Sequence, residues 1–186
     1  METEVRTNRQ YDEALASCRK VFLDKSRDYG TSWRALRIIS VADQVYIKAQ
    51  RIRTIQEKGV QRIGDSIASE FSGIANYCII GLIQMELDRE PLEDLPVEDV
   101  ARLYDRHADE ARALMADKNH DYGEAWRSMS QESFADLILA KVLRIRQILA
   151  NDGVTIASEG VGSNLLDIFN YALFAQILIS EGRHKG

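Results

Sequence analysis

The chain has 186 residues, of which 45% are hydrophobic and 28% are charged, and this composition is typical of one globular domain or two small ones. No apolar run approaches the roughly 18 residues that span a bilayer, so the sequence excludes membrane insertion. The first thirty residues are charged throughout and lack the apolar core of a secretory signal, so we expect a cytoplasmic protein. The net charge of −5 excludes a broad nucleic-acid surface, but it is compatible with a local cluster of cations for a small anion.

The first part of the chain is predicted to form three helices. The first helix should end near Gly30, because a glycine commonly follows a helix end, and a short turn with Trp33 comes next. Ser40 and Asp43 have the spacing of a capping box and predict the start of a second helix, which ends at Gly59. The third helix, ANYCIIGLIQMEL, is mostly apolar and is expected to lie at the centre of the fold.

The second part of the chain follows the same plan. Gly123 marks the end of a helix, and Trp126 lies in the turn that follows. Ser133 and Asp136 again have the spacing of a capping box, Gly153 marks the next helix end, and LLDIFNYALFAQILI is the apolar third helix. The joining segments VQRIGD and VTIAS are compatible with a short strand or a loop. Since no other stretch alternates like a strand, we predict an all-α fold.

The two parts are copies of one unit. A shift of 93 residues aligns positions 24 to 55 with 117 to 148 and gives 15 identities in 32 positions, where chance gives roughly two. After Gly59 the offset becomes 94. We therefore divide the chain into a first repeat (1–90), a linker (91–96) that holds both prolines, Pro91 and Pro96, and a second repeat (97–186). Neither repeat could bury its third helix alone, so we expect one cooperative bundle with pseudo-two-fold symmetry.

The motif K-x-x-D-Y-G-x-x-W-R occurs once in each repeat, at the end of the first helix. One interpretation is structural, with core aromatics, a glycine helix stop and an aspartate that caps or pairs with the arginine. The other is functional, because aromatic rings offer stacking surface for a base and cations attract phosphate. The second helix adds a lysine and an arginine three residues apart, which share one helical face in both repeats.

The third helix of the second repeat carries polar residues on one face, namely Ser163, Asp167 and Asn170, with Glu159 just before the helix. A buried aspartate requires a partner. Asp167 either pairs with a cation of the second helix or, with Glu159, holds Mg²⁺, which prefers oxygen ligands. In the first repeat Gly73 replaces Asp167, so we expect the second repeat to have kept more of the chemistry.

These motifs resemble a known family. KSRDYGTSWR and KNHDYGEAWR, each followed by D-x-x-x-x-K-x-x-R-I-R and a third helix with N-Y, resemble domain of unknown function 1599, also called nucleotide modification associated domain 1. The resemblance covers nearly the whole chain, twice.

More distantly, the helix order and the Tyr-Gly…Trp turn resemble the all-α nucleoside triphosphate pyrophosphatases of the MazG type. That resemblance implies Mg²⁺ held by E-x-x-E on the second helix and E-x-x-D on the third, hydrolysis to pyrophosphate, and third helices buried against a partner subunit. It therefore implies a possible homo-oligomer or, here, a dimer fused into one chain. The sequence departs from that pattern: the second helix has no E-x-x-E, and Glu159 and Asp167 are eight residues apart.

Three functional hypotheses follow. The first is a protein that binds a small-molecule nucleotide and, in its catalytic form, is a Mg²⁺-dependent pyrophosphohydrolase of (modified) deoxynucleoside triphosphates. Its catalytic candidates are Glu159, Asp167 and Asp121, and the first two are the metal ligands. The candidate nucleotide-binding residues are Lys25, Asp28, Tyr29, Trp33, Arg34, Lys48, Arg51, Asn76, Lys118, Tyr122, Trp126, Arg127, Lys141, Arg144 and Asn170. The second hypothesis is a non-catalytic module that senses nucleotides or assists nucleic-acid modification, and the third is a structural helical protein.

Overall fold

The computed structural model describes residues 2–88, 90 and 92–186, and this part of the chain forms six α-helices and no β-strand. The helices are α1 (Glu2–Tyr29), α2 (Ile38–Lys58), α3 (Ile67–Glu86), α4 (Val97–Tyr122), α5 (Gln131–Ala150) and α6 (Val161–Ser180). Short 3-10 helices, η1 (Ser32–Ala35) and η2 (Ala125–Ser128), contain the two tryptophans. The all-α prediction is therefore confirmed. None of the described helices combines the length and the apolar character needed to cross a bilayer.

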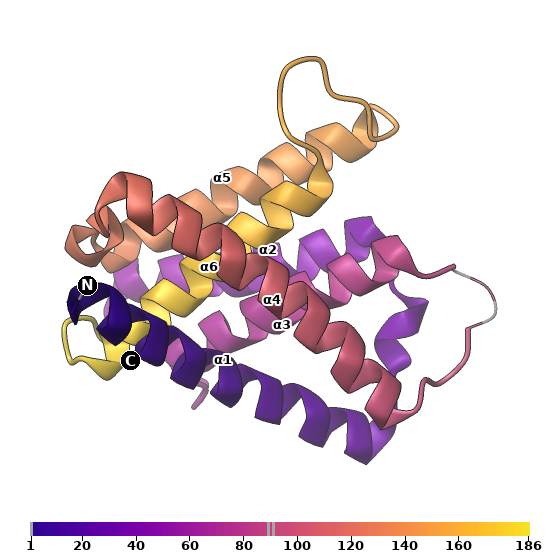
Figure 1. Ribbon diagram of the computed structural model, residues 1–186, viewed down its shortest axis with the longest axis horizontal. Coiled ribbons are helices and arrows are strands. Elements are labelled where there is room, and N and C mark those ends of the chain that lie inside the picture. The colour runs from indigo at the N-terminus through magenta and orange to yellow at the C-terminus, as the bar shows by residue number, and fades with distance from the viewer. Residues whose placement is uncertain (1, 89, 91) are drawn as a thin grey trace.

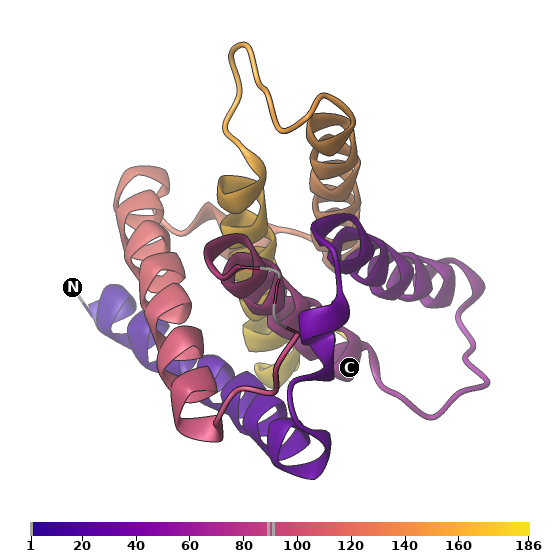
Figure 2. The ribbon, with the colours of Figure 1, turned by 90° about the vertical axis from the view of Figure 1, so that its right-hand side faces the viewer.

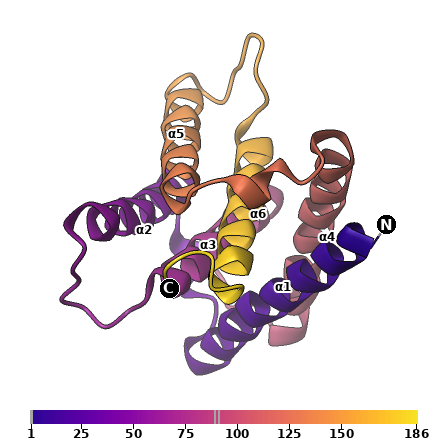
Figure 3. The same ribbon diagram turned by 90° about the vertical axis from the view of Figure 1, so that its left-hand side faces the viewer.

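The helices form three layers, with the two third helices in the middle (Figures 1 and 3). Helices α3 and α6 cross each other at the centre, with α2 and α5 packed on one side and α1 and α4 on the other. Figure 2 shows the same order of layers from the opposite side. The central position of α3 and α6 agrees with their apolar sequences, because a helix that is apolar on every face must be buried.

The contacts between helices follow a pseudo-two-fold pattern. Helix α1 packs against α4, α2 against α5 and α3 against α6, so each helix contacts its own copy in the other repeat. The remaining contacts occur in equivalent pairs. Helix α2 packs against α3 as α5 packs against α6, and α1 contacts α6 as α4 contacts α3. Every layer therefore contains one helix from each repeat.

The helix ends agree in part with the sequence. Gly59 caps the end of α2 and Gly123 caps the end of α4. Both are in the left-handed conformation, with φ of 68° and 59°, which confirms these two predicted helix ends. The predicted capping boxes are wrong, because both second helices begin earlier. Extended residues, Arg37 and Ser130, precede them, and Ser133 donates its backbone N–H to the Ser130 side chain at 3.2 Å instead of acting as the cap.

The three joining segments have no strand among their described residues. VQRIGD and VTIAS are loops, which settles the alternative that the sequence left open. In the predicted linker, Pro91 lies outside the described residues, and Pro96 precedes the first residue of α4. Asp94 accepts a hydrogen bond from the Thr31 backbone N–H at 2.9 Å, and Leu95 donates its N–H to the Thr31 hydroxyl at 3.0 Å. The end of the linker is thus bound to the motif turn of the first repeat.

A buried asparagine in each central helix ties the layers together. In α3, Asn76 accepts a hydrogen bond from the hydroxyl of Tyr104 in α4 at 2.9 Å and donates to the carbonyl of Cys18 in α1 at 3.1 Å. Tyr104 and Cys18 are fully buried, and Asn76 is 8% exposed. Asn76 thus joins a helix of its own repeat to a helix of the other.

The same network recurs around Asn170 in α6. Asn170 accepts from the hydroxyl of Tyr11 in α1 at 2.6 Å and donates to the carbonyl of Ala111 in α4 at 3.0 Å. Burial raises the pKa of the Tyr11 hydroxyl, so the phenol stays protonated and keeps its donor role. The second repeat supplies the tyrosine that binds Asn76, and the first repeat supplies the tyrosine that binds Asn170. Neither repeat alone can therefore provide all hydrogen-bond partners for the asparagine of its central helix.

Replacing Tyr104 by Phe is therefore expected to lower the free energy of unfolding by about 1–3 kcal/mol, because the Asn76 carbonyl oxygen would lose its donor in a buried position. The same loss is expected for Tyr11→Phe. Chemical denaturation followed by circular dichroism measures both. The control is Tyr122→Phe, since Tyr122 is 73% exposed and its change should be near zero. An equal effect of all three substitutions would contradict the network.

Candidate functional site

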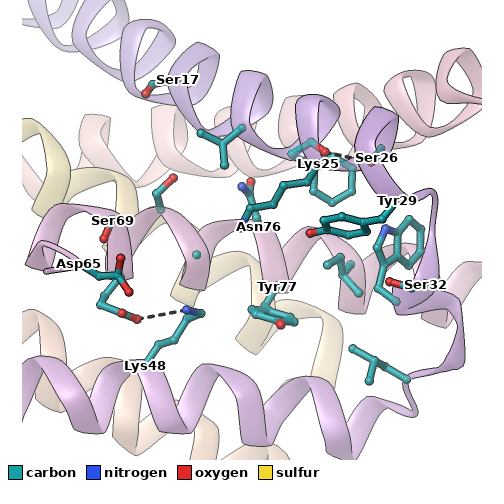
Figure 4. A pocket seen from close by; sticks show the side chains of 18 of the residues that line it. Ser17, Lys25, Ser26, Tyr29, Ser32, Lys48, Asp65, Ser69, Asn76 and Tyr77 are labelled. Carbon is teal, nitrogen blue, oxygen red and sulfur yellow. Dashed lines mark hydrogen bonds and ion pairs between the residues drawn. The ribbon is translucent and has the colours of Figure 1, made fainter. Parts of the chain in front are cut away.

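The candidate site is a pocket of about 690 Å³ that is lined mainly by α1, η1, α2 and α3 of the first repeat, together with Gln176 of α6. Lys25 from α1 and Lys48 from α2 enter it from opposite sides (Figure 4). Tyr29 and Tyr77 lie toward one end, and Asp65 and Ser69 toward the other. Pockets of this size are typical of small-molecule sites, which combine apolar walls with a few polar groups.

Aromatic side chains form one end of the pocket. Tyr29 is 58% exposed, Tyr77 is half-buried, and Trp33 is buried behind them against Phe22, with ring centroids 6.1 Å apart. Burial raises the pKa of the Tyr77 hydroxyl, and the nearby Tyr29 adds to the effect, so Tyr77 is a neutral phenol at pH 7. This end therefore offers uncharged aromatic faces.

The cations of the second helix share one carboxylate. The Lys48 ammonium lies 3.2 Å from Glu70, and the Arg51 guanidinium lies 2.7 Å from it. Arg51 also donates to the backbone carbonyl of Asp65 at 2.9 Å, which fixes the loop before α3. Glu70 is only 6% exposed, so its charge is balanced inside the protein rather than by solvent.

Lys25 is the pocket cation without a counter-charge. No carboxylate of a described residue lies within 4.0 Å of its ammonium group, and its side chain extends from α1 toward Asn76 in Figure 4. An uncompensated lysine beside aromatic rings is a suitable group for attracting an anion.

The equivalent positions of the second repeat hold an internal anion instead. Asp167 lies 2.6 Å from the ammonium of Lys118 and 2.8 Å from that of Lys141. Burial raises the pKa of the Asp167 carboxyl, but the hydrogen bonds from the two lysines outweigh it and hold the pKa below its usual value. The sequence left open whether Asp167 pairs with a cation of the second helix or binds Mg²⁺, and in the structure it forms the ion pair. Lys118 is a second partner that the sequence analysis did not predict.

The two repeats place their acidic residue one helical turn apart. With the offset of 94, Glu70 corresponds to Asn164 and Gly73 to Asp167. In the first repeat the carboxylate pairs with Lys48 and Arg51, and in the second it pairs with the counterparts of Lys25 and Lys48. The sequence analysis treated Gly73 only as the loss of Asp167 and did not include Glu70 among the site residues, and this exchange between the repeats is the signal that identifies both.

The motif arginines and the second tryptophan belong to the scaffold. Arg34 is buried and donates to the Gln84 side chain and the Asp88 carbonyl. Arg127 pairs with Glu124 at 3.3 Å and with Glu181 at 3.2 Å.

Trp126 stacks on Phe174 with ring centroids 4.2 Å apart, and the Arg127 guanidinium lies 4.4 Å above the Trp126 ring. The structure therefore assigns packing contacts to Arg34, Arg127 and Trp126.

Several other candidates lie on the surface and are not brought together: Asp28, Asp121, Tyr122, Arg144 and Glu159 are all exposed. Among the described residues, Asp121 has an ion-pair contact only with the neighbouring His120, at 3.1 Å. Asn170 is occupied by the buried network described above, whereas Asn76 takes part in its network and also lines the pocket.

The residues present do not fit a resident Mg²⁺ ion. The two carboxylate oxygens of Asp167 each face a lysine ammonium, and Glu159 lies in the exposed loop before α6. Among the described residues, no three acidic, histidine or cysteine side chains are grouped as metal ligands. A Mg²⁺ site generally needs carboxylates that are free to coordinate, and Asp167 is not.

Replacing Asp167 by Asn is expected to lower the free energy of unfolding at pH 7 by about 1–3 kcal/mol, because two lysines lose their counter-charge. The folded pKa lies below the usual 3.8, so the wild-type advantage is present above that pH and is lost as the pH falls through the folded pKa. Denaturation series from about pH 2 to 7 measure this dependence.

The control for that series is Asp121→Asn, whose carboxylate is 78% exposed, and its effect should stay near zero at every pH. Equal losses in the two variants would indicate that the repeated motif itself braces the bundle and would contradict the assignment of the ion pair.

Comparison with known proteins agrees with the duplicated sequence. The family model described as nucleotide modification associated domain 1 matches residues 25–85 and again residues 118–179. No curated protein and no solved structure matches the chain, so a relation to the MazG-type pyrophosphatases is not confirmed. The two matches together cover more than half of the chain and include both copies of the motif. The chain therefore belongs to the nucleotide modification associated domain 1 family and carries two copies of its domain in tandem.

Proposed function

We propose that this protein is a non-catalytic nucleotide-binding module, and that the nucleotide binds in the pocket of the first repeat. The observation that carries the proposal is the combination, in one pocket of about 690 Å³, of exposed aromatic rings and a lysine without a counter-charge. Such a pocket offers stacking surface and an anion-binding group to the same ligand. The description of the family, which refers to nucleotide modification, supports this choice of ligand.

The base is expected to occupy the aromatic end of the pocket. Tyr29 and Tyr77 come from α1 and α3 and present uncharged rings there. Stacking on aromatic side chains is worth about 1–3 kcal/mol per base and tolerates any base, because every base has a π face. The phosphate then lies toward Lys25, whose ammonium has no carboxylate partner among the described residues.

Binding without hydrolysis is the form of the proposal that the geometry favours. Hydrolysis of a triphosphate in the manner of the MazG type requires several carboxylates around Mg²⁺, and Glu70 and Asp167 are both held in ion pairs. A sensor of nucleotides, or an accessory to an enzyme of nucleic-acid modification, needs only the pocket. Because α3 and α6 cover each other within one chain, binding needs no second copy. We place this activity in the cytoplasm, where free nucleotides are abundant.

Isothermal titration calorimetry with the four 2′-deoxynucleoside 5′-phosphates tests the proposal, and saturable binding is expected. Lys25→Gln should weaken binding by about ten-fold, which corresponds to roughly 1.4 kcal/mol. Tyr29→Leu should weaken it by a similar factor through lost stacking. The control Lys20→Gln removes an exposed lysine of α1 that pairs with Asp24 and does not line the pocket, so affinity should not change.

A parallel assay for pyrophosphate release, with deoxynucleoside triphosphates and Mg²⁺, should detect no turnover. Turnover would show that the protein is an enzyme and would overturn the non-catalytic form of the proposal. Absence of binding for every nucleotide, with a folded protein by circular dichroism, would overturn the proposal as a whole and leave the structural hypothesis.

A further inference from the structure

We infer that Gly73, Lys25 and Lys48 form a binding site for a single phosphate group, which we call the seat. The second repeat contains an equivalent seat, which is occupied by the protein's own Asp167 carboxylate. The ligand of the first repeat is accordingly a nucleoside monophosphate. This inference rests on the proposed function, because it assigns the position and number of the phosphates within the same pocket.

The second repeat shows how the seat holds an anion. The Asp167 carboxylate lies between two ammonium groups, 2.6 Å from that of Lys118 and 2.8 Å from that of Lys141. Their counterparts in the first repeat are Lys25 and Lys48, and both line the pocket together with Gly73 (Figure 4). The first repeat thus keeps the two lysines of the seat, but Lys48 is paired with Glu70 and only Lys25 has no carboxylate partner among the described residues.

Glycine leaves the space that the aspartate side chain would take. A Cβ atom built on Gly73 would lie 2.8 Å from Cε of Lys48, which is closer than two carbon atoms can pack. Lys48 can therefore lie across α3 only because residue 73 has no side chain. Its aliphatic stem occupies this position, and its ammonium faces the pocket that Lys25 enters from α1.

The position of the Glu70 carboxylate, one helical turn before Gly73, determines the charge of the pocket. Glu70 takes over the pairing of Lys48 and Arg51, so the carboxylate binds one turn away from Gly73 and leaves Lys25 uncompensated. Lys25, Lys48 and Arg51 together outnumber the one Glu70 carboxylate, so the pocket keeps positive charge for a phosphate monoester, which carries about 1.5–2 negative charges at pH 7. Further phosphates, directed away from the aromatic end, would approach Asp65 at the opposite end of the pocket, and its carboxylate would repel them. The charges therefore favour a monophosphate over a triphosphate.

Calorimetry with a deoxynucleoside, its 5′-monophosphate and its 5′-triphosphate, without added metal, tests the ligand class. The monophosphate is expected to bind at least ten-fold more tightly than either of the others. A triphosphate that binds as tightly as the monophosphate, or more tightly, would overturn the assignment to a single phosphate.

Filling the seat from the protein side tests its position. Gly73→Asp is expected to lower monophosphate affinity by more than ten-fold, because its carboxylate would pair with Lys25 and Lys48 as Asp167 does with their counterparts. Gly73→Asn has the same shape without the charge and should retain higher affinity than the aspartate variant. Wild-type affinity in Gly73→Asp, or equal affinity in the two variants, would contradict the seat.

Emptying the second seat provides the reverse test in the other repeat. Asp167→Gly is expected to raise the stoichiometry of monophosphate binding from one to two per chain, and the added site should disappear again in the double variant with Lys118→Gln. A folded Asp167→Gly variant that still binds one monophosphate would overturn the equivalence of the two seats. Because this variant and Gly73→Asp alter different repeats, loss of folding in one leaves the other decisive.

The outcomes separate the inference from the function on which it rests. If nucleotides bind and respond to Lys25→Gln but not to Gly73→Asp, the pocket function stands and the phosphate seat is wrong. If no nucleotide binds to the folded wild-type protein, the proposed function itself fails.

Discussion

The hydrogen bonds of two buried asparagines, Asn76 and Asn170, constrain the whole bundle. An amide in the middle of an apolar helix is costly to bury unless its oxygen and its nitrogen both find partners. Here the partners come from both repeats, because Tyr104 of α4 donates to Asn76 and Tyr11 of α1 donates to Asn170. Each central helix is therefore complete only when the outer helix of the other repeat is in place. This reciprocity makes the duplicated chain one unit and fixes α1 above α3, where the pocket forms.

The two repeats have equivalent helix packing but differ in the ion pairs around the candidate site. Both repeats keep the lysines of the first and second helices, while the acidic partner differs by one turn of the third helix. In the second repeat Asp167 pairs with two lysines, and in the first repeat Glu70 pairs with Lys48 and Arg51. A single exchange of this kind converts an internal ion pair into a pocket with an available cation. In the proposed function, one copy supports the fold while the other copy provides the binding pocket.

The sequence was sufficient for much of this architecture and for part of the site. Periodicity, the glycine stops and the repeat predicted six helices and the central third helices, because these signals are local. The roles of the motif residues were not local. Lys25 and Arg34 belong to the same motif, yet Lys25 enters the pocket while Arg34 is buried against Gln84. The capping boxes failed for a different, local reason, since the extended residues Arg37 and Ser130, three positions upstream of the predicted caps, precede the two helices.

The sequence by itself determined the helical class, the duplication and the types of residue available for binding an anion. Only the tertiary structure decided which copy leaves the lysine of its first helix without a carboxylate partner among the described residues. Sequence comparison favoured the second repeat, because it retains Asp167, but that carboxylate is neutralised by Lys118 and Lys141 in the fold. The first repeat looked depleted because of Gly73, yet the missing side chain provides the space for the stem of Lys48, and Lys25 lines the same pocket without a carboxylate partner among the described residues. The physical reason is that a charged group is available to a ligand only where the packed helices leave it without an internal partner.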